Sequence, residues 1–375
     1  MNTQTEIQKS TTATIVTANL RSALALAKTC MSKGANRAIP VLGTVRIAIK
    51  GGMGIITATD LDREIAINFA AEGENIDFLI QPRFLEHVLK HGGSTAEISR
   101  GEWKYIGHPM PSIAFKSGEL TAKFNEIIPV EDFPHSMFDQ RNFEQPQEIE
   151  ASVFRYGLDA CNATISTEET RYYLNGIYLE AVDGHLRMVS TDGHRMTQAD
   201  LSDIPWERKG MILPACAVSQ LRKDLKGLDM IRFALSTDKL AIRISNPKWS
   251  MVTKLIDGQF PDYRRVIPQN VDGSFSVALT GDALAAFPAF GDRSTPLHII
   301  PEEGCMFVQS PELGKISMPI YGAEGPARGI NIRYLKSFCP RGEAIRLIGN
   351  KAEHNPILVM GADENVLRLV MPMRI

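Results

Sequence analysis

The sequence predicts an α+β protein of three similar domains, each with two helices packed on antiparallel sheets. Two observations lead to this prediction. A short apolar strand followed by a helix recurs at three places about 130 residues apart. Between these helices the chain shows the alternating apolar pattern of β-strands, as in Leu186–Ser190 and Lys239–Ile244. The length of 375 residues fits this number of ordinary domains.

Each copy is expected to open with a strand that leads into a helix. The three openings are Ala13–Ala27, Gln147–Leu158 and Ser274–Phe287. Asn19, Ser152 and Asp282 are residue types whose side chains accept hydrogen bonds from a first helical turn. We therefore expect these three residues to be the helix N-caps.

A second helix in each copy is expected to start near Pro82, Pro214 and Asn331. Proline suits the first position of a helix, because the N–H that it lacks has no partner there. The pattern Thr-Asp-x-x-Arg also recurs, at Thr59–Arg63 and at Thr191–Arg195, and its two aspartates are 132 residues apart. The copies therefore agree in more than one element.

These repeats predict three domains. Pro- and Asp-rich linkers around residues 134–146 and 267–273 indicate the boundaries. The polar segment 1–12 has no counterpart in the other copies and is expected to be an extension of the first domain. The predicted domains are residues 1–138, 139–268 and 269–375.

Composition indicates a soluble cytoplasmic protein. The 41 Lys and Arg nearly balance the 43 Asp and Glu, and the chain has neither a long apolar run nor a signal-peptide pattern. The five cysteines are scattered and never spaced C-x-x-C, so we expect reduced thiols, with no disulfide framework and no zinc site. No phosphate-binding loop is present, and no cofactor or metal is expected. Ser190–His194 holds a hydroxyl, a carboxylate and an imidazole, but its Asp-Gly pair is more typical of a turn than of a catalytic triad.

The predicted helices are basic although the chain is not. They carry ten basic and four acidic residues, so the remainder of the chain has a net charge of −8. Such a face can be merely solvated, but its recurrence in every copy favours a polyanion as partner. The predicted helices are Asn19–Cys30, Arg83–His91, Val153–Asn162, Ala215–Lys226, Asp282–Phe287 and Ile332–Phe338. The candidates for DNA binding on this ground are Arg21, Arg83, Arg155, Arg222, Lys223 and Lys226.

Five strings occur in the order expected of one known family. They are Thr59–Asp62, Arg171–Gly176, Thr191–Arg195, Asp257–Val266 and Val370–Ile375. Together they resemble the bacterial β sliding clamp, the processivity subunit of DNA polymerase III. The resemblance implies a DNA-clamp fold and a head-to-tail homodimer, whose six domains form a ring around duplex DNA. Such a ring slides without sequence specificity and without catalysis.

The resemblance also implies site residues. Arg37, Tyr172 and Tyr173 are expected at DNA, although the tyrosines also fit half-buried structural positions. Phe124 and Phe290 are expected at the dimer interface. The polymerase α subunit, the clamp loader and other clamp-binding proteins are expected to insert a peptide between the second and third domains. The residues of this pocket are Leu174, Thr191, Gly193, His194, Arg195, Met196, Pro261, Arg265, Val266, Leu369, Val370, Met371, Pro372 and Met373.

Two departures from the family leave an alternative open. Ala327–Asn331 replaces a string that usually contains glutamate, and the helix after Asp282 meets Pro288 early. Both changes lie in the third copy, on which closure of the dimer depends. The alternative is a clamp-fold interaction scaffold that does not close a ring. The C-terminal segment, taken alone, fits a last core strand as well as a binding site.

Overall fold

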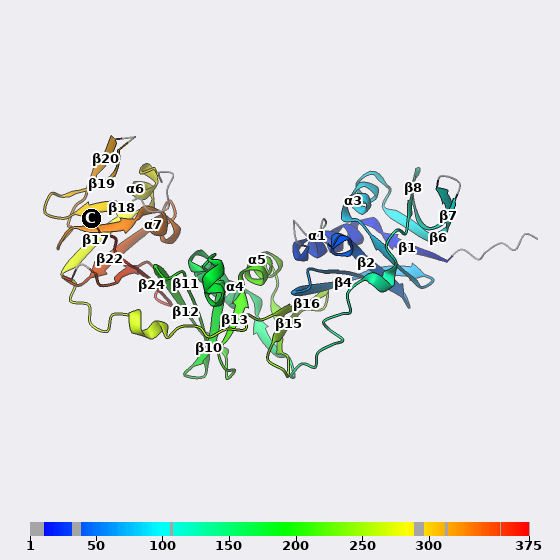
Figure 1. Cartoon of the computed structure of the whole chain (residues 1–375), viewed down its shortest axis with the longest axis horizontal. Coiled ribbons are helices and arrows are strands. Elements are labelled where there is room, and N and C mark those ends of the chain that lie inside the picture. The colour runs from blue at the N-terminus through cyan, green and yellow to red at the C-terminus, as the bar shows by residue number, and fades with distance from the viewer. Residues whose placement is uncertain are drawn as a thin grey trace, which may run out of the picture. The chain divides into compact units, whose positions relative to one another are not determined.

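A computed structural model describes residues 11–31, 39–105, 108–288, 296–311, 314–352 and 354–374. The chain divides into two compact units (Figure 1). Unit 1 comprises Met1–Ile149 and Asp229–Lys254, and unit 2 comprises Glu150–Leu228 and Leu255–Ile375. The predicted second domain thus contributes strands to both units.

Unit 1 contains a sheet of twelve antiparallel strands. Its main path runs β8-β7-β6-β1-β4-β16-β15-β14-β9, while β3, β2 and β5 branch from β4. Helices α1 (Thr17–Cys30) and α3 (Pro82–His91) lie side by side, and α1 packs on β3 and β4. The strands are β1 (Thr12–Val16), β2 (Val45–Lys50), β3 (Met53–Thr59), β4 (Arg63–Gly73), β5 (Ile76–Ile80), β6 (Thr95–Tyr105), β7 (His108–Ser117), β8 (Leu120–Asn125), β9 (Gln147–Glu150), β14 (Met230–Leu235), β15 (Ala241–Ser245) and β16 (Trp249–Lys254).

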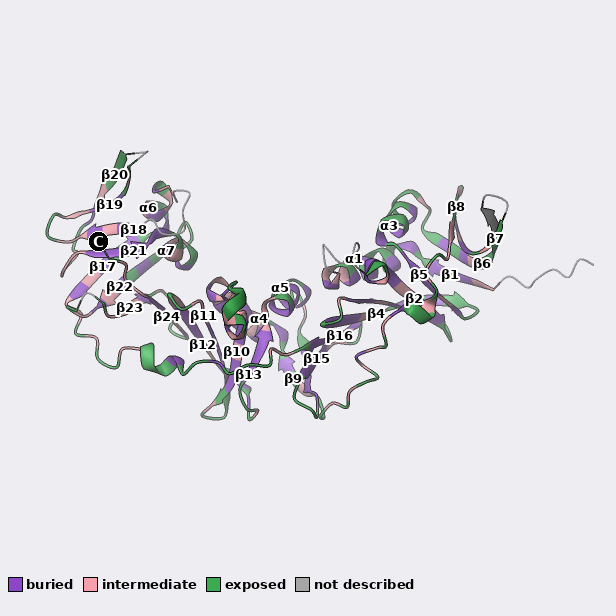
Figure 2. Cartoon of the chain, in the orientation of Figure 1, coloured by how far each residue is buried: buried purple, intermediate pink, exposed green. Residues whose placement is uncertain are grey.

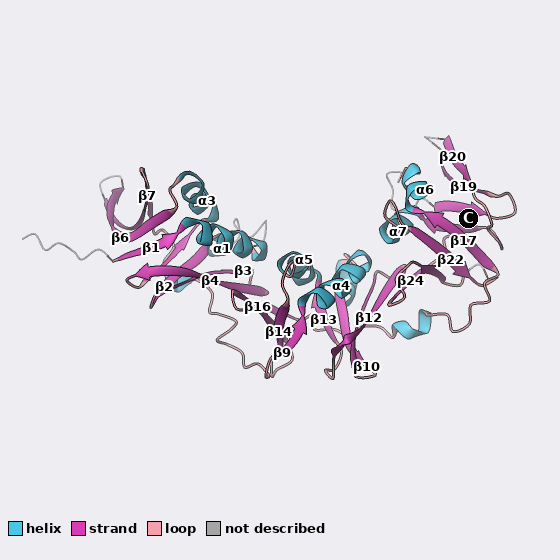
Figure 3. Cartoon of the chain, turned by 180° about the vertical axis from the view of Figure 1, so that it is seen from behind, coloured by secondary structure: helices cyan, strands magenta, loops and turns pink. Residues whose placement is uncertain are grey.

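Unit 2 contains an eight-stranded sheet, β13-β10-β11-β12-β24-β23-β22-β17, and a four-stranded sheet, β20-β19-β18-β21. Two helix pairs pack on them, α4 (Ala151–Cys161) with α5 (Ala215–Asp224), and α6 (Gly281–Ala286) with α7 (Ile332–Phe338) (Figure 3). The strands are β10 (Gly176–Val182), β11 (His185–Thr191), β12 (Arg195–Pro205), β13 (Met211–Pro214), β17 (Phe275–Thr280), β18 (Pro296–Ile300), β19 (Cys305–Ser310), β20 (Gly314–Pro319), β21 (Arg328–Asn331), β22 (Ala344–Gly349), β23 (Ile357–Met360) and β24 (Val366–Val370).

The predicted helices are confirmed, but the predicted N-caps are wrong. The residues before α1, α4 and α6 are Val16, Glu150 and Thr280, and only Thr280 caps its helix through its side chain. Asn19, Ser152 and Asp282 lie inside the first turn instead. The physical reason is that each strand runs into its helix without a loop, so strand pairing fixes where the helix begins. Asn331 does cap α7, because its Oδ1 accepts the Arg333 N–H at 3.0 Å.

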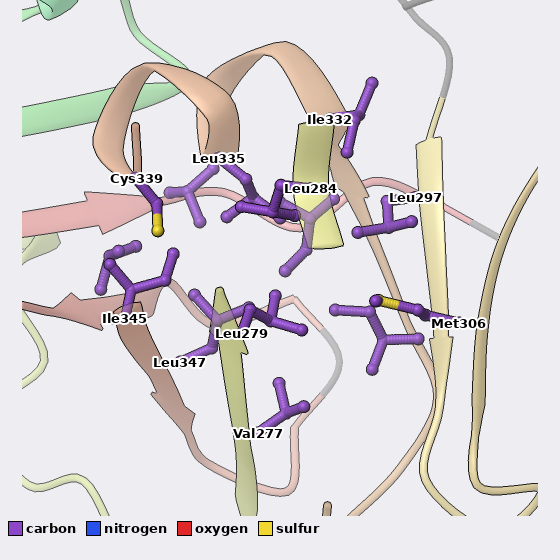
Figure 4. Packing of buried hydrophobic residues seen from close by; sticks show 14 of the residues in the cluster. Val277, Leu279, Leu284, Leu297, Met306, Ile332, Leu335, Cys339, Ile345 and Leu347 are labelled. Carbon is purple, nitrogen blue, oxygen red and sulfur yellow. The ribbon is translucent and has the colours of Figure 1, made fainter. Parts of the chain in front are cut away.

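The helices pack through one apolar face. Leu20 and Leu24 of α1 are buried, whereas Arg21 and Lys28 of the same helix are exposed. Figure 2 shows buried and exposed stretches on the helices. In the third repeat, Leu284 of α6 and Leu335 of α7 meet side chains of the two sheets in one cluster (Figure 4). Burial of such side chains contributes roughly 1.5–3 kcal/mol each to the free energy of folding. The opposite, polar helix faces therefore remain available for charge.

Each unit contains an antiparallel joint between strands that are distant in sequence. In unit 1, β4 pairs with β16, with Arg63 opposite Thr253. In unit 2, β12 pairs with β24, with Arg195 opposite Val370. Arg63 and Arg195 occupy corresponding places in the two copies, so the repeat extends to how the strands are joined.

The two Thr-Asp-x-x-Arg strings fold into the same turn. Thr59 Oγ1 and Thr191 Oγ1 donate to the carbonyls of Arg63 and Arg195, at 2.7 and 2.8 Å. The third residue of each turn has a left-handed backbone, with φ of +75° at Leu61 and +88° at Gly193. Glycine adopts this conformation without strain, whereas leucine adopts it at a cost. The first copy therefore stores backbone strain at an exposed turn.

We expect Leu61→Gly to stabilise the protein by about 0.5–1 kcal/mol, because the exchange removes the left-handed strain. Gly193→Ala is the reverse test at the corresponding residue. A Cβ there would lie 2.4 Å from Arg171 Nη1, and its φ is +88°, so we expect it to destabilise. Urea unfolding followed by circular dichroism measures both. A Leu61→Gly protein less stable than the wild type would contradict the assignment of strain.

Candidate functional site

A hairpin turn between β11 and β12 forms the rim of a cavity in unit 2. Asp192 Oδ1 accepts the N–H groups of His194 and Arg195, both at 3.0 Å. Its Oδ2 accepts Arg195 Nε at 2.9 Å. A single carboxylate thus fixes the main chain of the turn and the direction of the Arg195 side chain, which holds the rim in one conformation.

The cavity beside this rim has a volume of about 250 Å³. Its floor is apolar, because Leu174, Met196 and Leu369 belong to one buried cluster. Pro261 and Val266 form another wall, and Val266 is 43% exposed. A small apolar cavity with a polar rim suits one or two apolar side chains of a ligand.

Ten of the fourteen predicted pocket residues line this cavity. The structure brings these ten residues together around one cavity, and their function in binding stays a prediction. They are Leu174, Thr191, Gly193, His194, Arg195, Met196, Pro261, Val266, Leu369 and Met371.

The other four predicted residues lie elsewhere. Arg265 pairs with Asp262 at 3.0 Å, and its side chain is 84% exposed. Val370 is fully buried between β12 and β23, so for this residue the interpretation as a core strand is the better one. Pro372 and Met373 line a second, larger cavity of about 810 Å³.

The larger cavity adjoins the smaller one, because both are lined by His194, Arg195 and Met371. Arg195 Nη1 donates to Ser337 Oγ at 2.6 Å, and its guanidinium lies 4.4 Å from the centre of the Tyr334 ring. The Met371 N–H donates to the His194 carbonyl at 2.8 Å. These contacts join the rim turn, α7 and the C-terminal segment around one pair of cavities.

Sequence reasoning missed four residues that line the smaller cavity: Arg171, Tyr173, Asp262 and Tyr263. All four lie inside two of the strings that resemble the clamp family, Arg171–Gly176 and Asp257–Val266. Membership of those strings could have identified them as residues of the cavity. Arg171 Nε donates to Glu168 Oε2 at 2.8 Å, and its Nη2 donates to the Asp192 carbonyl at 3.1 Å. Arg171 therefore holds the main chain of the rim turn while lining the cavity.

Ser190, Asp192 and His194 do not form a catalytic triad. Ser190 is fully buried, and its hydroxyl donates to the Cys161 carbonyl at 2.6 Å. The Asp192 carboxylate is bound to the turn and to Arg195. Within the described ranges, no three His, Cys, Asp or Glu side chains are placed to hold a metal ion. No helix in the same ranges is long and apolar enough to span a membrane.

Most of the basic DNA-binding candidates that the structure describes lie on helices, and several are engaged by residues of the same helix pair. Arg21 of α1 donates to the Leu89 carbonyl of α3, and Lys28 pairs with Glu86 of α3. In unit 2, Arg155 and Arg222 pair with the same carboxylate, Asp159, at 3.1 and 2.6 Å. The pairs are about one-third exposed or more, so each contributes little to stability.

Arg83, Lys223 and Lys226 are exposed, and no ion pair of theirs is found among the described residues. Helix α5 ends at Asp224, so Lys226 lies just beyond the helix predicted to contain it. Tyr172 is 53% exposed, whereas Tyr173 packs against the cluster below the cavity. Tyr172 is thus the more accessible of the two predicted tyrosines. Arg37 lies outside the described residues.

Phe124 lines an open cavity of about 510 Å³ in unit 1. It lies on β8, at the edge of the twelve-stranded sheet, and packs 5.3 Å from the Phe84 ring. Ile127, which lines the same cavity, is 79% exposed. An apolar cavity beside an unpaired strand edge is a surface that another chain can cover. Phe290 lies outside the described residues.

Comparison with known families finds one match. The model for the central domain of the DNA polymerase III beta subunit matches residues 148–262. Among curated proteins, the beta sliding clamp of Caulobacter vibrioides is 28% identical over 365 residues, covering 90% of this chain and 93% of the relative. The beta sliding clamp of Rickettsia bellii is 30% identical over 272 residues, covering 68% of this chain and 66% of the relative.

Solved structures extend the likeness to the whole fold. The Caulobacter crescentus beta sliding clamp with bound PEG is 26% identical, with a TM-score of 0.82 over 98% of this chain and 99% of the other. The Bartonella birtlesii clamp bound to griselimycin is also 26% identical, with a TM-score of 0.82 over 98% and 100% of the two chains.

We expect Asp192→Ala to lower the free energy of unfolding by about 2 kcal/mol, because two main-chain N–H groups and the Arg195 side chain lose their acceptor. Asp262→Ala is the matched control. Its ion pair with Arg265 is largely exposed, so we expect less than about 0.5 kcal/mol. Urea unfolding measures both, and equal effects would contradict the assigned importance of the rim carboxylate.

Proposed function

Because the chain belongs to the bacterial β sliding clamp family, we propose that it is a non-catalytic processivity factor that encircles duplex DNA and tethers DNA polymerase III. The observation that carries the proposal is that the likeness to solved clamps extends over the whole chain rather than one domain. The proposal places the protein in the cytoplasm, with three clamp domains near residues 1–138, 139–268 and 269–375.

In this proposal, electrostatic attraction between basic side chains and DNA phosphates is sufficient for the DNA contact. A closed ring retains DNA by topology, so its side chains need neither base contacts nor a tight grip. Arg83 and Lys223 are exposed on helices, and Lys226 is exposed just beyond the end of α5. Attraction of this kind to phosphates is independent of sequence and weakens with salt.

The paired cavities of unit 2 suit a short peptide from a partner protein. The smaller cavity would take an apolar anchor against Met196 and Leu369, and the larger one would take the neighbouring residues beside Tyr334 and Pro372. Methionine side chains such as Met371 adapt to differently shaped ligands. The polymerase α subunit, the clamp loader and other clamp-binding proteins are the partners we propose for this site.

The ring requires two copies, joined head to tail. The cavity at Phe124 would accept an apolar side chain of the second copy beside the edge of β8. A clamp-fold scaffold that does not close is the alternative, and the mass of the native particle decides between the two.

For the DNA contact, we expect the double change Lys223→Glu and Lys226→Glu to weaken binding of a labelled duplex. Each lost phosphate contact should reduce the slope of log K against log salt by about 0.9. Fluorescence anisotropy across a sodium chloride series measures this slope. The double change Lys209→Glu and Lys248→Glu, at exposed lysines outside the helices, is the charge-matched control.

Encirclement itself is tested with nicked circular DNA, after loading with a bacterial clamp loader and ATP. The wild type should stay on the circle through gel filtration and leave it after a restriction cut. Equal retention on circular and linear DNA would contradict encirclement.

For the dimer, light scattering of the wild type at micromolar concentration should give twice the chain mass of 41.5 kDa. Phe124→Asp should give one chain mass, because it places a charge in an apolar interface. Met53→Asp, at a 51% exposed methionine of unit 1, should leave the dimer intact. A wild type of one chain mass would support the scaffold instead of the ring.

A further inference from the structure

One wall of the smaller cavity stands outside every sheet. Pro261 and Val266 belong to the segment 255–267, whose regular structure is limited to the 3-10 turn η5 (Tyr263–Val266). Met196 and Leu369, across the cavity, belong to the paired strands β12 and β24. The sheet therefore holds one side of the cavity, and the position of the other side needs a separate explanation.

Two consecutive residues of η5 bind one carboxylate oxygen. Tyr263 Oη donates to Glu180 Oε1, and Arg264 Nη2 donates to the same oxygen at 2.7 Å. Glu180 lies on β10 and is 8% exposed. Hydrogen bonds to a charged acceptor are stronger than neutral ones, and strongest when shielded from water. Burial, together with the Glu180 hydrogen bond, raises the pKa of Tyr263 to about 12, so this phenol remains a donor at neutral pH.

Besides Glu180, Tyr263 has a side-chain hydrogen bond with Arg187 of β11. The main-chain hydrogen bonds of the turn join its own residues. The Arg265 N–H donates to the Asp262 carbonyl at 3.4 Å, and the Ile267 N–H donates to the Arg264 carbonyl at 3.3 Å. These bonds shape η5 but do not attach it to the sheet. Upstream, the Phe260 ring stacks on Tyr178 with centroids 4.8 Å apart. The Glu180 carboxylate is thus the polar attachment of η5 to β10.

We propose that Glu180 is a positioning residue for partner binding, which fixes η5 and so sets the distance between Val266 and the sheet side of the cavity. This inference rests on the proposed function, because it assumes that the cavity takes an apolar anchor of a peptide. Glu180 does not line the cavity itself. Its effect on a ligand would pass through Tyr263 and Arg264.

The experiment compares Glu180→Ala and Glu180→Gln in binding a labelled decapeptide that ends in Leu-Phe. Alanine removes the acceptor, and we expect about a tenfold weaker affinity with most of the change in the dissociation rate. Glutamine keeps an oxygen that accepts both hydrogen bonds, so we expect it to restore affinity to within about threefold of the wild type. Fluorescence anisotropy and stopped-flow dissociation provide the measurements.

Glu148→Ala is the matched control. Glu148 pairs with Arg232 at 3.4 Å, both side chains are at least 60% exposed, and Glu148 does not line the cavity. We expect its affinity for the peptide to be unchanged. Wild-type affinity in Glu180→Ala, or an equal loss in the alanine and glutamine variants, would overturn the assignment to Glu180. Failure of the wild type to bind the peptide would instead contradict the proposed pocket.

Discussion

The main-chain pairing of β12 with β24 is the constraint on which the rest of unit 2 depends. It places the start of β12, at Arg195, opposite Val370, although the two are far apart in the sequence. The rim turn precedes β12 and the C-terminal segment follows β24, so both arrive at the same end of the joint. Both segments line the two cavities: His194, Arg195 and Met371 border both, and Tyr334 of α7 borders the larger one.

Duplication gave the chain the same turn twice, but the two copies use it differently. Both carboxylates, Asp60 and Asp192, accept main-chain N–H groups and the Nε of the following arginine. In the first copy Arg63 is buried and donates to the Cys30 carbonyl at 3.4 Å, at the end of α1. In the second copy Arg195 reaches Ser337 of α7 and borders both cavities. The same turn thus holds Arg63 against the end of α1 in the first copy and Arg195 beside the two cavities in the second.

Each predicted helix begins and ends within two residues of the observed one. The regular spacing of apolar residues along the helices made this possible. The predicted N-caps were wrong because each of these helices follows a strand without a loop. Pairing of that strand with distant strands, which the sequence does not show, fixes the first residue of the helix. The resemblance of strings such as Thr191–Arg195 to the clamp family pointed to ten residues that line the smaller cavity, and their role in binding stays a prediction. It did not separate Val370 from Leu369, because only the register of β24 decides which of the two buried side chains faces the cavity. The Glu180 contact joins residues 83 and 84 positions apart, a distance that no local pattern reveals.

The ion pairs within the helix pairs bear on how the protein would slide along DNA in the proposed function. Lys28, Arg155 and Arg222 each share their charge with a carboxylate on the same helix pair. A cation held in this way forms a shallower energy well at each passing phosphate than an unpaired one does. In the proposed function, the shallower wells lower the barrier between successive phosphate positions. The protein would then diffuse along the duplex with less friction than its count of basic residues suggests.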